Sequence, residues 1–551
     1  MRRVVLRAGV LFGAILWTAV CVVAAAQPAN LATSDQLSAM PPASVEVRDL
    51  LQQGRQLEGQ ARWSEALSLY EEAMRQFPEN ASVVQRFVFS RLHYDLGRRY
   101  NDPSFLALAE GLSLGQALGL YDEVLLKIQA HYVEAPDWRQ LAEWGANAFE
   151  VALSEPAFRR VNCPTATEAA VEQLRAELRE KIRGRVIPSR EAAGQAALEA
   201  ATLARQRLGI VPGAVIFEYV CGATNALDPY SAYLTPSQLT DVYSQIEGNF
   251  VGLGIELKAD GGTLLIVRVI PGSPAQRAGI LPGDRIMAVD GRPTKDLTTD
   301  QAANLLQGKE GSVATLVVAG AEGTPRQLAI RREQVDVPSV DAVQILDRDR
   351  AIGYLRITCF QKTTSRDLDA ALWDLQRAGM QSLIIDLRGN PGGLLIMAVE
   401  VADKFLADGV IVSTRGRMVQ EDFTYTAHQI GTWSVPLVVL IDGDSASAAE
   451  IFAGAIRDHH RGTIVGTRSY GKGSVQGIFP LGIGNSGVRL TTAKFYSPSG
   501  RPFALVGVEP DIQVRKAVRP IGGSLPQADG LAHDPVVAAA LQAAKQSVAR
   551  R

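Results

Sequence analysis

The sequence is poor in the residues that build disulfide frameworks and metal centres. Its 551 residues include only four cysteines and six histidines. The spacing of Cys21, Cys163, Cys221 and Cys359 is not that of zinc ligands, and the histidines form no zinc motif. If Cys21 leaves with an amino-terminal leader, the three remaining thiols cannot all be paired. We therefore expect no disulfide scaffold, no metal site and no cofactor.

The sequence also lacks an excess of charge of one sign. It has 56 Lys and Arg residues against 58 Asp and Glu, which gives a formal net charge of −2. This balance gives no reason to expect nucleic acid or an anionic membrane as a partner. Apolar residues, in contrast, make up 47% of the chain. That content and length predict several folded cores.

The first 26 residues have the pattern of a secretory signal peptide. Arg2, Arg3 and Arg7 precede an apolar run, and small residues follow it up to Ala26. We expect cleavage near Ala26 and a protein that is exported, periplasmic or otherwise extracytoplasmic. Alternatively, residues 8–26 stay uncleaved as a membrane anchor, since the run is almost long enough to span a bilayer.

A linker over 27–43 leads into a helical region, 44–100, that resembles part of a tetratricopeptide repeat. Small Ala66 and Ala73 would let helices pack closely, with Tyr70 filling the groove. A single repeat cannot bury its own apolar face, and no second copy follows. Two interpretations stay open: a repeat that binds an adaptor, or a helical hairpin that packs on its own chain.

Residues 101–240 are also predicted to be helical. Apolar residues recur at i, i+3 and i+4 over 118–132, 138–153 and 166–181. The pattern ends at 227–234, where Asp and Pro interrupt it.

A β module is predicted for residues 241–336, because the apolar period changes toward two. The pattern predicts strands at 250–257, 264–270, 284–291 and 313–318, and helices at 274–279 and 299–307.

Residues 337–516 alternate between apolar strands and helices. The pattern predicts strands at 352–357, 382–386, 435–441 and 462–465, and helices near 363–379, 396–406 and 448–457. Such alternation predicts a covered, largely parallel sheet with crossover helices. A linker and a helix starting near Asp534 fill the last segment, 517–551.

Three segments of this last region could carry chemistry. The strand 435–441 runs through small residues, Ser447 among them, into a helix whose free N–H groups could stabilise an oxyanion. A simple capping box between Ser447 and Glu450 explains the same pattern. A second segment holds Lys472 between two glycines; it is not a P-loop, and a solvated surface lysine is the plain alternative. The third, 386–393, is a strand that enters a glycine-rich turn.

Together these segments closely resemble the carboxyl-terminal processing peptidase family, also called tail-specific proteases. The resemblance covers about 110–515 and includes the motifs at 227–234, 496–501 and 507–511. It implies a multidomain α+β fold. The parts would be a helical N-terminal region, a PDZ domain at 241–336, and an α/β peptidase core of the tail-specific protease (crotonase/ClpP-like) type.

The resemblance also implies the roles of individual residues. Ser447 matches the nucleophile and Lys472 the general base. Gln476 matches the glutamine that orients the lysine. The oxyanion hole would use the N–H of Ala448 and that of Gly392 or Gly393. The chain departs from the family pattern at two positions outside the proton path, Ala449 and Ile396.

A lysine can act as a base only if it is neutral. Free lysine titrates near ~10.4, and burial among apolar strands can lower this toward roughly 7–8. Ser–Lys dyads are a known variant of the serine-protease scheme. The rival bases are His459 and His460, which follow a helix C-terminus where histidine commonly only complements the dipole.

The PDZ domain would select the substrate. The loop Gly252-Leu253-Gly254-Ile255 matches the family's carboxylate-binding loop, and Leu253, Ile255 and Leu306 would line a pocket for an apolar last residue. Alternatively, the module only packs on the peptidase. We therefore expect a serine endopeptidase that recognises C-terminal tails and works through an acyl-enzyme; the alternative is a non-catalytic PDZ/TPR-like binding or scaffold protein.

Overall fold

The computed structural model describes residues 45–77, 80–182, 184–260, 263–296, 305–320, 323–428, 431–514, 531 and 534–549. The predicted signal peptide, the linker over 27–43 and most of the late linker lie outside these residues, as does most of the helix expected at 299–307. Within the described ranges, no helix combines the length and apolarity that a membrane span requires. Cys163, Cys221 and Cys359 are buried free thiols.

The first described elements are three helices that share one apolar core and include the expected helical hairpin: α1 (Val45–Gly59), α2 (Trp63–Gln76) and α3 (Ala81–Arg99). Tyr70 is buried against Gly54, where any side chain would collide with the tyrosine ring. The hairpin packs on its own chain: α3 contacts the next helical layer, and His93 bonds Glu155 there. This arrangement fits the second of the two interpretations of residues 44–100.

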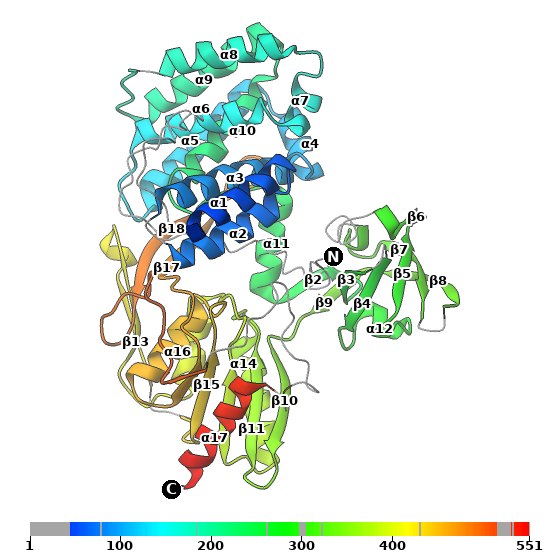
Figure 1. Cartoon of the computed structure of the whole chain (residues 1–551), viewed down its shortest axis with the longest axis vertical. Coiled ribbons are helices and arrows are strands. Elements are labelled where there is room, and N and C mark those ends of the chain that lie inside the picture. Colours follow the sequence, from blue (N-terminus) through cyan, green and yellow to red (C-terminus); the bar gives the residue numbers. More distant parts are fainter. Residues whose placement is uncertain are drawn as a thin grey trace.

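A larger helical body follows, as expected from the periodicity (Figure 1). Its helices are α4 (Pro103–Gly111), α5 (Leu114–His131), α6 (Trp138–Ala152), α7 (Pro156–Asn162), α8 (Glu168–Ile182), α9 (Arg190–Leu208), α10 (Pro212–Asn225) and α11 (Pro236–Glu247). Helix α10 is buried along almost its whole length. It packs closely on α6 because Gly222 faces Gly145 with no side chain between them.

The β module projects to one side of the molecule on a two-stranded stalk (Figure 1). The stalk pairs β2 (Asn249–Gly252) with β9 (Glu333–Asp336). The module's sheet contains β3 (Ile255–Asp260), β4 (Thr263–Val269), β5 (Arg285–Val289), β6 (Arg292–Pro293), β7 (Val313–Ala319) and β8 (Pro325–Arg331), with α12 (Pro274–Arg277) beside it. The single strand predicted at 250–257 is wrong in one respect. The chain turns at Gly254, whose φ is +79°, and so divides it into β2 and β3.

The core domain is built on a six-stranded sheet whose strands are parallel except at one edge. Its order is β10 (Val340–Asp347), β11 (Ile352–Ile357), β12 (Ser382–Asp386), β15 (Leu437–Ile441), β16 (Thr463–Gly466) and β19 (Ile512–Gln513), with β10 antiparallel. Helices α14 (Thr364–Arg377), α15 (Leu395–Asp403) and α16 (Ala448–Asp458) share an apolar core with one face of the sheet. Helix α17 (Pro535–Ala549) covers the other face.

A second, antiparallel sheet, which the sequence analysis did not predict, joins the core domain to the helical body. It orders β1 (Ala232–Leu234), β18 (Gly487–Tyr496), β13 (Val410–Gly416) and β14 (Phe423–Thr426), and β17 (Ser474–Pro480) also pairs with β18. Because β18 pairs with β1, two segments more than 250 residues apart in sequence become neighbours.

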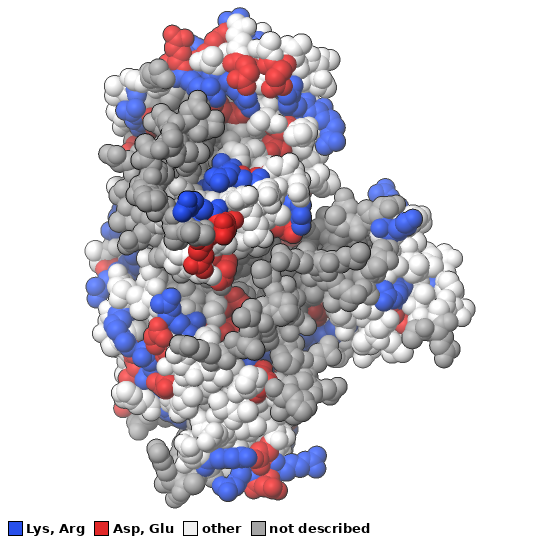
Figure 2. Space-filling model, viewed as in Figure 1, with Lys and Arg blue, Asp and Glu red and all other residues white. Residues whose placement is uncertain are grey.

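Basic and acidic side chains are interspersed on the face of the molecule drawn in Figure 2. Pairs such as Arg185–Glu199 and Arg159–Glu168 occur on the helical body. Each such exposed pair contributes little to stability, because water screens it.

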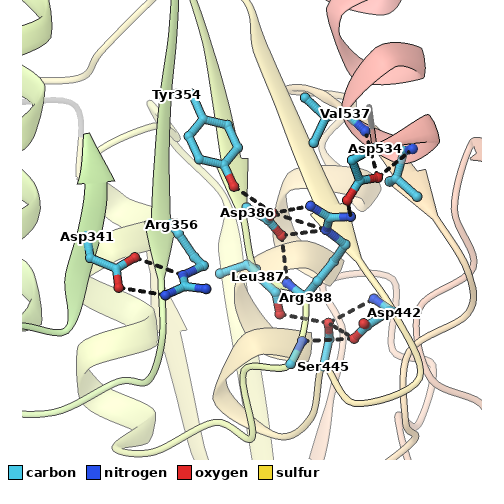
Figure 3. A network of polar contacts seen from close by, with 12 residues as sticks. Asp341, Tyr354, Arg356, Asp386, Leu387, Arg388, Asp442, Ser445, Asp534 and Val537 are labelled. Atoms are coloured by element: carbon cyan, nitrogen blue, oxygen red, sulfur yellow. Dashed lines mark hydrogen bonds and ion pairs between the residues drawn. The ribbon is translucent and has the colours of Figure 1, made fainter. Parts of the chain in front are cut away.

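A buried ion-pair network fixes α17 to the sheet (Figure 3). The Arg388 guanidinium, 1% exposed, donates to Asp386 (2.6 Å) and to Asp534 (2.7 Å). Tyr354 donates a further hydrogen bond to Asp386 at 2.8 Å. Asp534 also accepts the N–H of Val536 and so caps the helix. Burial would raise the pKa of Asp534, but Arg388 and the helix N–H groups outweigh it and lower that pKa.

We predict that Asp534→Ala lowers the free energy of unfolding by about 3–5 kcal/mol, because it leaves a buried guanidinium with one partner fewer. Urea denaturation followed by circular dichroism measures the change. The matched control on the same helix is Lys545→Ala, which breaks an ion pair with Asp347 that is 46% exposed on the lysine side; it should cost about 1 kcal/mol or less. Equal effects of the two substitutions would contradict a stabilising role for the buried ion-pair network.

Candidate active site

Ser447 lies where β15 passes into α16, in a conformation that is rare for a side-chain-bearing residue. Its φ is 55° and its ψ is −114°, outside the usual regions for an L-residue. Such strain persists only where the surroundings impose it, and it is concentrated at functional sites. The neighbouring turn imposes part of it here, since the backbone oxygen of Asn390 accepts the N–H of Ala446 at 2.9 Å.

Lys472 lies in the loop between β16 and β17 and is only 2% exposed. Its ammonium nitrogen lies 4.9 Å from the centre of the Tyr230 ring. Burial, helped by the nearby charge of Arg489, lowers the pKa of Lys472 well below its ordinary value; Glu450 and Asp228 act in the opposite direction. A buried amine with a lowered pKa is what a lysine base requires.

Arg489 on β18 has its own pKa lowered to about 10, first by burial and then by Arg91. Its Nε donates to the backbone oxygen of Tyr230 at 2.7 Å. Arg489 and Tyr230 both contribute to the surroundings of the Lys472 amine, and neither role was predicted from the sequence. Tyr230 stands within a motif that we singled out, but nothing in the sequence indicates that it covers the lysine.

Glu450 brings the segments of Ser447 and Lys472 together. Its carboxylate is fully buried, and Oε2 accepts the backbone N–H of Ser447 and of Lys472, both at 2.8 Å. Oε1 accepts the Ser469 hydroxyl and the Gly471 N–H, both at 2.6 Å. Burial raises the pKa of Glu450 to about 7, against these four hydrogen bonds, which lower it. The sequence suggested only a capping box here, and the link to the lysine loop was missed.

The glycine-rich turn after β12 packs directly against the nucleophile. A Cβ added to Gly392 would lie 2.7 Å from the Cβ of Ser447 and 3.0 Å from the nitrogen of Ala448. The N–H of Gly392 donates to Asn390 Oδ1 at 2.8 Å. Of the two predicted glycine donors, Gly393 is therefore the one whose N–H has no partner among the described residues. Ala448 is the first residue of α16, where an N–H has no partner within the helix.

Gln476 lies on β17, four residues after the lysine. Its amide donates to Ser474 Oγ at 2.9 Å and, less closely, to Thr491 Oγ1 at 3.4 Å. That it orients the lysine stays a prediction.

The two histidines named as rival bases follow the C-terminus of α16, whereas Ser447 lies at its N-terminus. The helix has 11 residues, so its C-terminus is about 16 Å from Ser447. His459 Nε2 is engaged with the backbone oxygen of Val410 at 2.7 Å. Neither His459 nor His460 is placed to take the serine proton.

In the β module, the predicted carboxylate loop (252–255) joins β2 to β3. The carbonyl oxygen of Leu253 accepts the Ala275 N–H, and that of Gly254 accepts the Ile270 N–H, both at 2.9 Å. A Cβ on Gly254 would lie 2.2 Å from that of Ser273, so only glycine fits. The two carbonyl groups are thus held inside the module.

The three residues expected to line the tail pocket lie in the module's apolar core. Leu253, Ile255 and Leu306 are 2%, 3% and 6% exposed. Residues 297–304 lie outside the described residues, so the role of these three side chains in a pocket stays a prediction.

The lowered pKa of Lys472 predicts a cost in stability. The unfolded chain protonates this amine below its model value of 10.5, whereas the folded site disfavours the proton. Lys472→Met should therefore raise the free energy of unfolding at pH 7, because the unfolded chain then no longer gains stability by protonating this amine. The gain should shrink as the pH rises toward 10.5.

Thermal unfolding from pH 6 to 10 measures this gain. Lys494→Met is the matched control, because Lys494 lies on β18 and is 47% exposed; it should leave the profile unchanged. A destabilised Lys472→Met chain would contradict the inferred shift.

Comparisons with known proteins find similarity to both the core domain and the β module. The model described as peptidase family S41 matches residues 351–514, and a PDZ domain model matches 265–320. The chain is 41% identical over 302 residues to a carboxy-terminal-processing protease of Bartonella bacilliformis, covering 54% of this chain and 68% of that one. It is 33% identical over 290 residues to a carboxyl-terminal-processing protease of Synechocystis sp., covering 52% and 67%.

Among solved structures, the photosystem II D1 C-terminal processing protease is 26% identical, with 72% of this chain and 92% of that one covered and a TM-score of 0.38. The two relatives confirm the resemblance drawn from the motifs. The chain belongs to peptidase family S41, the carboxy-terminal processing proteases, which are serine peptidases, and it carries a PDZ domain.

Proposed function

We propose that this peptidase cleaves proteins with a Ser447–Lys472 dyad and selects them by their C-terminal tails. One observation carries the assignment of the dyad. A strained serine and a buried lysine with a lowered pKa have their backbone N–H groups on the same oxygen of Glu450.

The proposed reaction runs through an ester. Neutral Lys472 takes the proton of the Ser447 hydroxyl as its oxygen bonds to the carbonyl carbon of the scissile peptide. The carbon–nitrogen bond then breaks, and the lysine returns the proton to the leaving amine. Water, deprotonated by the same lysine, attacks the ester carbon. As the ester C–O bond breaks, the lysine returns that proton to Ser447 Oγ, and the new C-terminal carboxyl group leaves and ionises.

The developing oxyanion needs donors that are already in place. The N–H groups of Ala448 and Gly393 are the ones that we propose, because Ala448 begins a helix and the Gly392 N–H is engaged with Asn390. Gln476 is proposed to orient the lysine from β17.

Tail selection is assigned to the PDZ domain. A terminal carboxylate would bind the N–H groups of loop 252–255, and an apolar last side chain would enter beside Leu253, Ile255 and Leu306. We further propose export through the first 26 residues, with membrane attachment only if 8–26 remain uncleaved. An adaptor bound to residues 44–100 is a separate prediction and has no part in the catalytic proposal.

We predict that Ser447→Ala and Lys472→Ala each reduce cleavage of an unfolded protein substrate by at least about 10³-fold with the fold retained, since dyad members act as a unit. Gel assays and labelling with a fluorophosphonate measure the loss. Lys494→Ala, an exposed lysine on β18, is the control and should keep full activity. Substantial activity in either dyad variant would refute the assignment.

Amidating the C-terminus of a peptide substrate should lower kcat/KM about 10-fold or more, because hydrogen bonds to a charged carboxylate contribute about 1.5–3 kcal/mol. The comparison uses two peptides that differ only in this group. A short peptide without the tail serves as a control, and its amide should be cleaved as fast as its acid. Indifference of the tailed peptide to amidation would remove the recognition claim.

A further inference from the structure

The buried carboxylate of Glu450 has an unusual set of partners, because all four described donors belong to segments that carry the chemistry. Ser447 is the residue with the strained backbone, and its N–H donates to Glu450 Oε2 at 2.8 Å. Lys472 and Gly471 are consecutive in the base loop, and both donate their backbone N–H groups. The fourth donor is the Ser469 hydroxyl, at the start of that loop.

Ser469 extends the connection to a third segment. Its Oγ also accepts the N–H of Val508 at 2.6 Å, so the motif at 507–511 is tied to the same point. Three motifs that are separate in sequence therefore meet through one side chain. Glu450 itself lies in the first turn of α16, which is buried on the core of the domain. The packing of this helix therefore also constrains the position of the carboxylate.

Only a carboxylate can accept all of them. Three of the donors are backbone N–H groups, which cannot become acceptors. An amide in place of the acid would direct its NH2 group at either the Ser447 and Lys472 donors or the Gly471 donor. At least one buried N–H would then lose its partner, and the loop would have to move to relieve the repulsion.

We infer that Glu450 is the positioning residue of the dyad: its carboxylate fixes the distance between the backbone at Ser447 and the backbone at Lys472. This role rests on the proposed function. It assigns to Glu450 no contact with the substrate. Because a displacement of about 1 Å can reduce a rate about 100-fold, a single carboxylate that spans both segments governs turnover rather than substrate binding.

The test is Glu450→Gln in the full chain, assayed with a tailed peptide substrate. We expect kcat to fall about 100-fold while KM stays within about 3-fold, since the PDZ domain is remote from the substitution. Fluorophosphonate labelling of Ser447 should slow in parallel. Ser469→Ala removes one donor and leaves the Ser447 and Lys472 bonds, so it should lose less activity, about 3- to 10-fold.

A pH profile separates positioning from a general loss of structure. The charges that act on the Lys472 amine are Glu450 from α16, Arg489 from β18 and Asp228 from the segment before β1, and the Tyr230 ring covers it. Glu450 raises the pKa of the amine. In Glu450→Gln, the ascending limb of the residual kcat/KM should therefore move to lower pH. An unmoved limb would overturn the inference.

The matched control is Glu218→Gln, another fully buried carboxylate, which is paired with Arg99 in the helical body. It should lower the unfolding midpoint but leave kcat per folded molecule unchanged. Three further outcomes overturn the positioning role alone: full kcat in Glu450→Gln, a loss that only follows the folded fraction, or an equal loss in Glu218→Gln. If Glu450→Gln does not fold, full activity in Ser469→Ala overturns it. An inactive wild-type chain would instead overturn the proposed function, and the positioning role with it.

Discussion

The site depends on one conformational constraint, which is that Ser447 is held at positive φ where a buried strand enters a buried helix. An isolated chain would leave this conformation, so the surrounding structure must impose it. Strand β15 lies inside the sheet, α16 is packed on its face, and the turn after β12 fills the space beside the serine. Parallel strands end at the same edge of a sheet, so that turn and the serine meet because of the topology. The reactive geometry is therefore a property of the whole core domain.

Helix α17, which covers the face of the sheet opposite to α16, also stabilises this edge of the sheet. Arg388 follows β12 by two residues and reaches Asp534, the residue before α17, while the Ser445 hydroxyl donates to the backbone oxygen of Leu387 at 2.8 Å (Figure 3). The segment that precedes the nucleophile is thus hydrogen-bonded to the turn after β12, and Asp534 beside α17 is paired with Arg388 in the same turn. A helix near the end of the chain contributes to the active-site framework without touching any reacting group.

Features encoded in local runs of residues could be predicted from the sequence, whereas features that depend on tertiary contacts could not. Runs such as Ser382–Asp386 are continuous apolar segments between turns, so the parallel strands and the Ser447 and Lys472 motifs were predictable. Strand β18 was not, because polar residues such as Arg489, Thr491 and Thr492 interrupt its apolar positions although most of the strand is buried. Its register, moreover, depends on the distant strand β1 and on β17. At 250–257 the alternation of apolar residues predicted one strand, but Gly254 adopts a positive φ that separates two strands. Arg489 reaches the lysine only through tertiary contacts, and no spacing in the sequence indicates this.

Burial shifts the pKa values of Lys472 and Glu450 in opposite directions. The mechanism requires a neutral lysine but an ionised glutamate. Burial lowers the pKa of Lys472 and raises that of Glu450, so both groups are driven toward their neutral forms. The base must be neutral, but four donors favour an ionised carboxylate. These described donors are three backbone N–H groups and a hydroxyl, all uncharged. A carboxylate stabilised in this way can keep its charge without requiring the lysine to be protonated, whereas an ion pair with the amine would keep the proton on the base and stop the reaction.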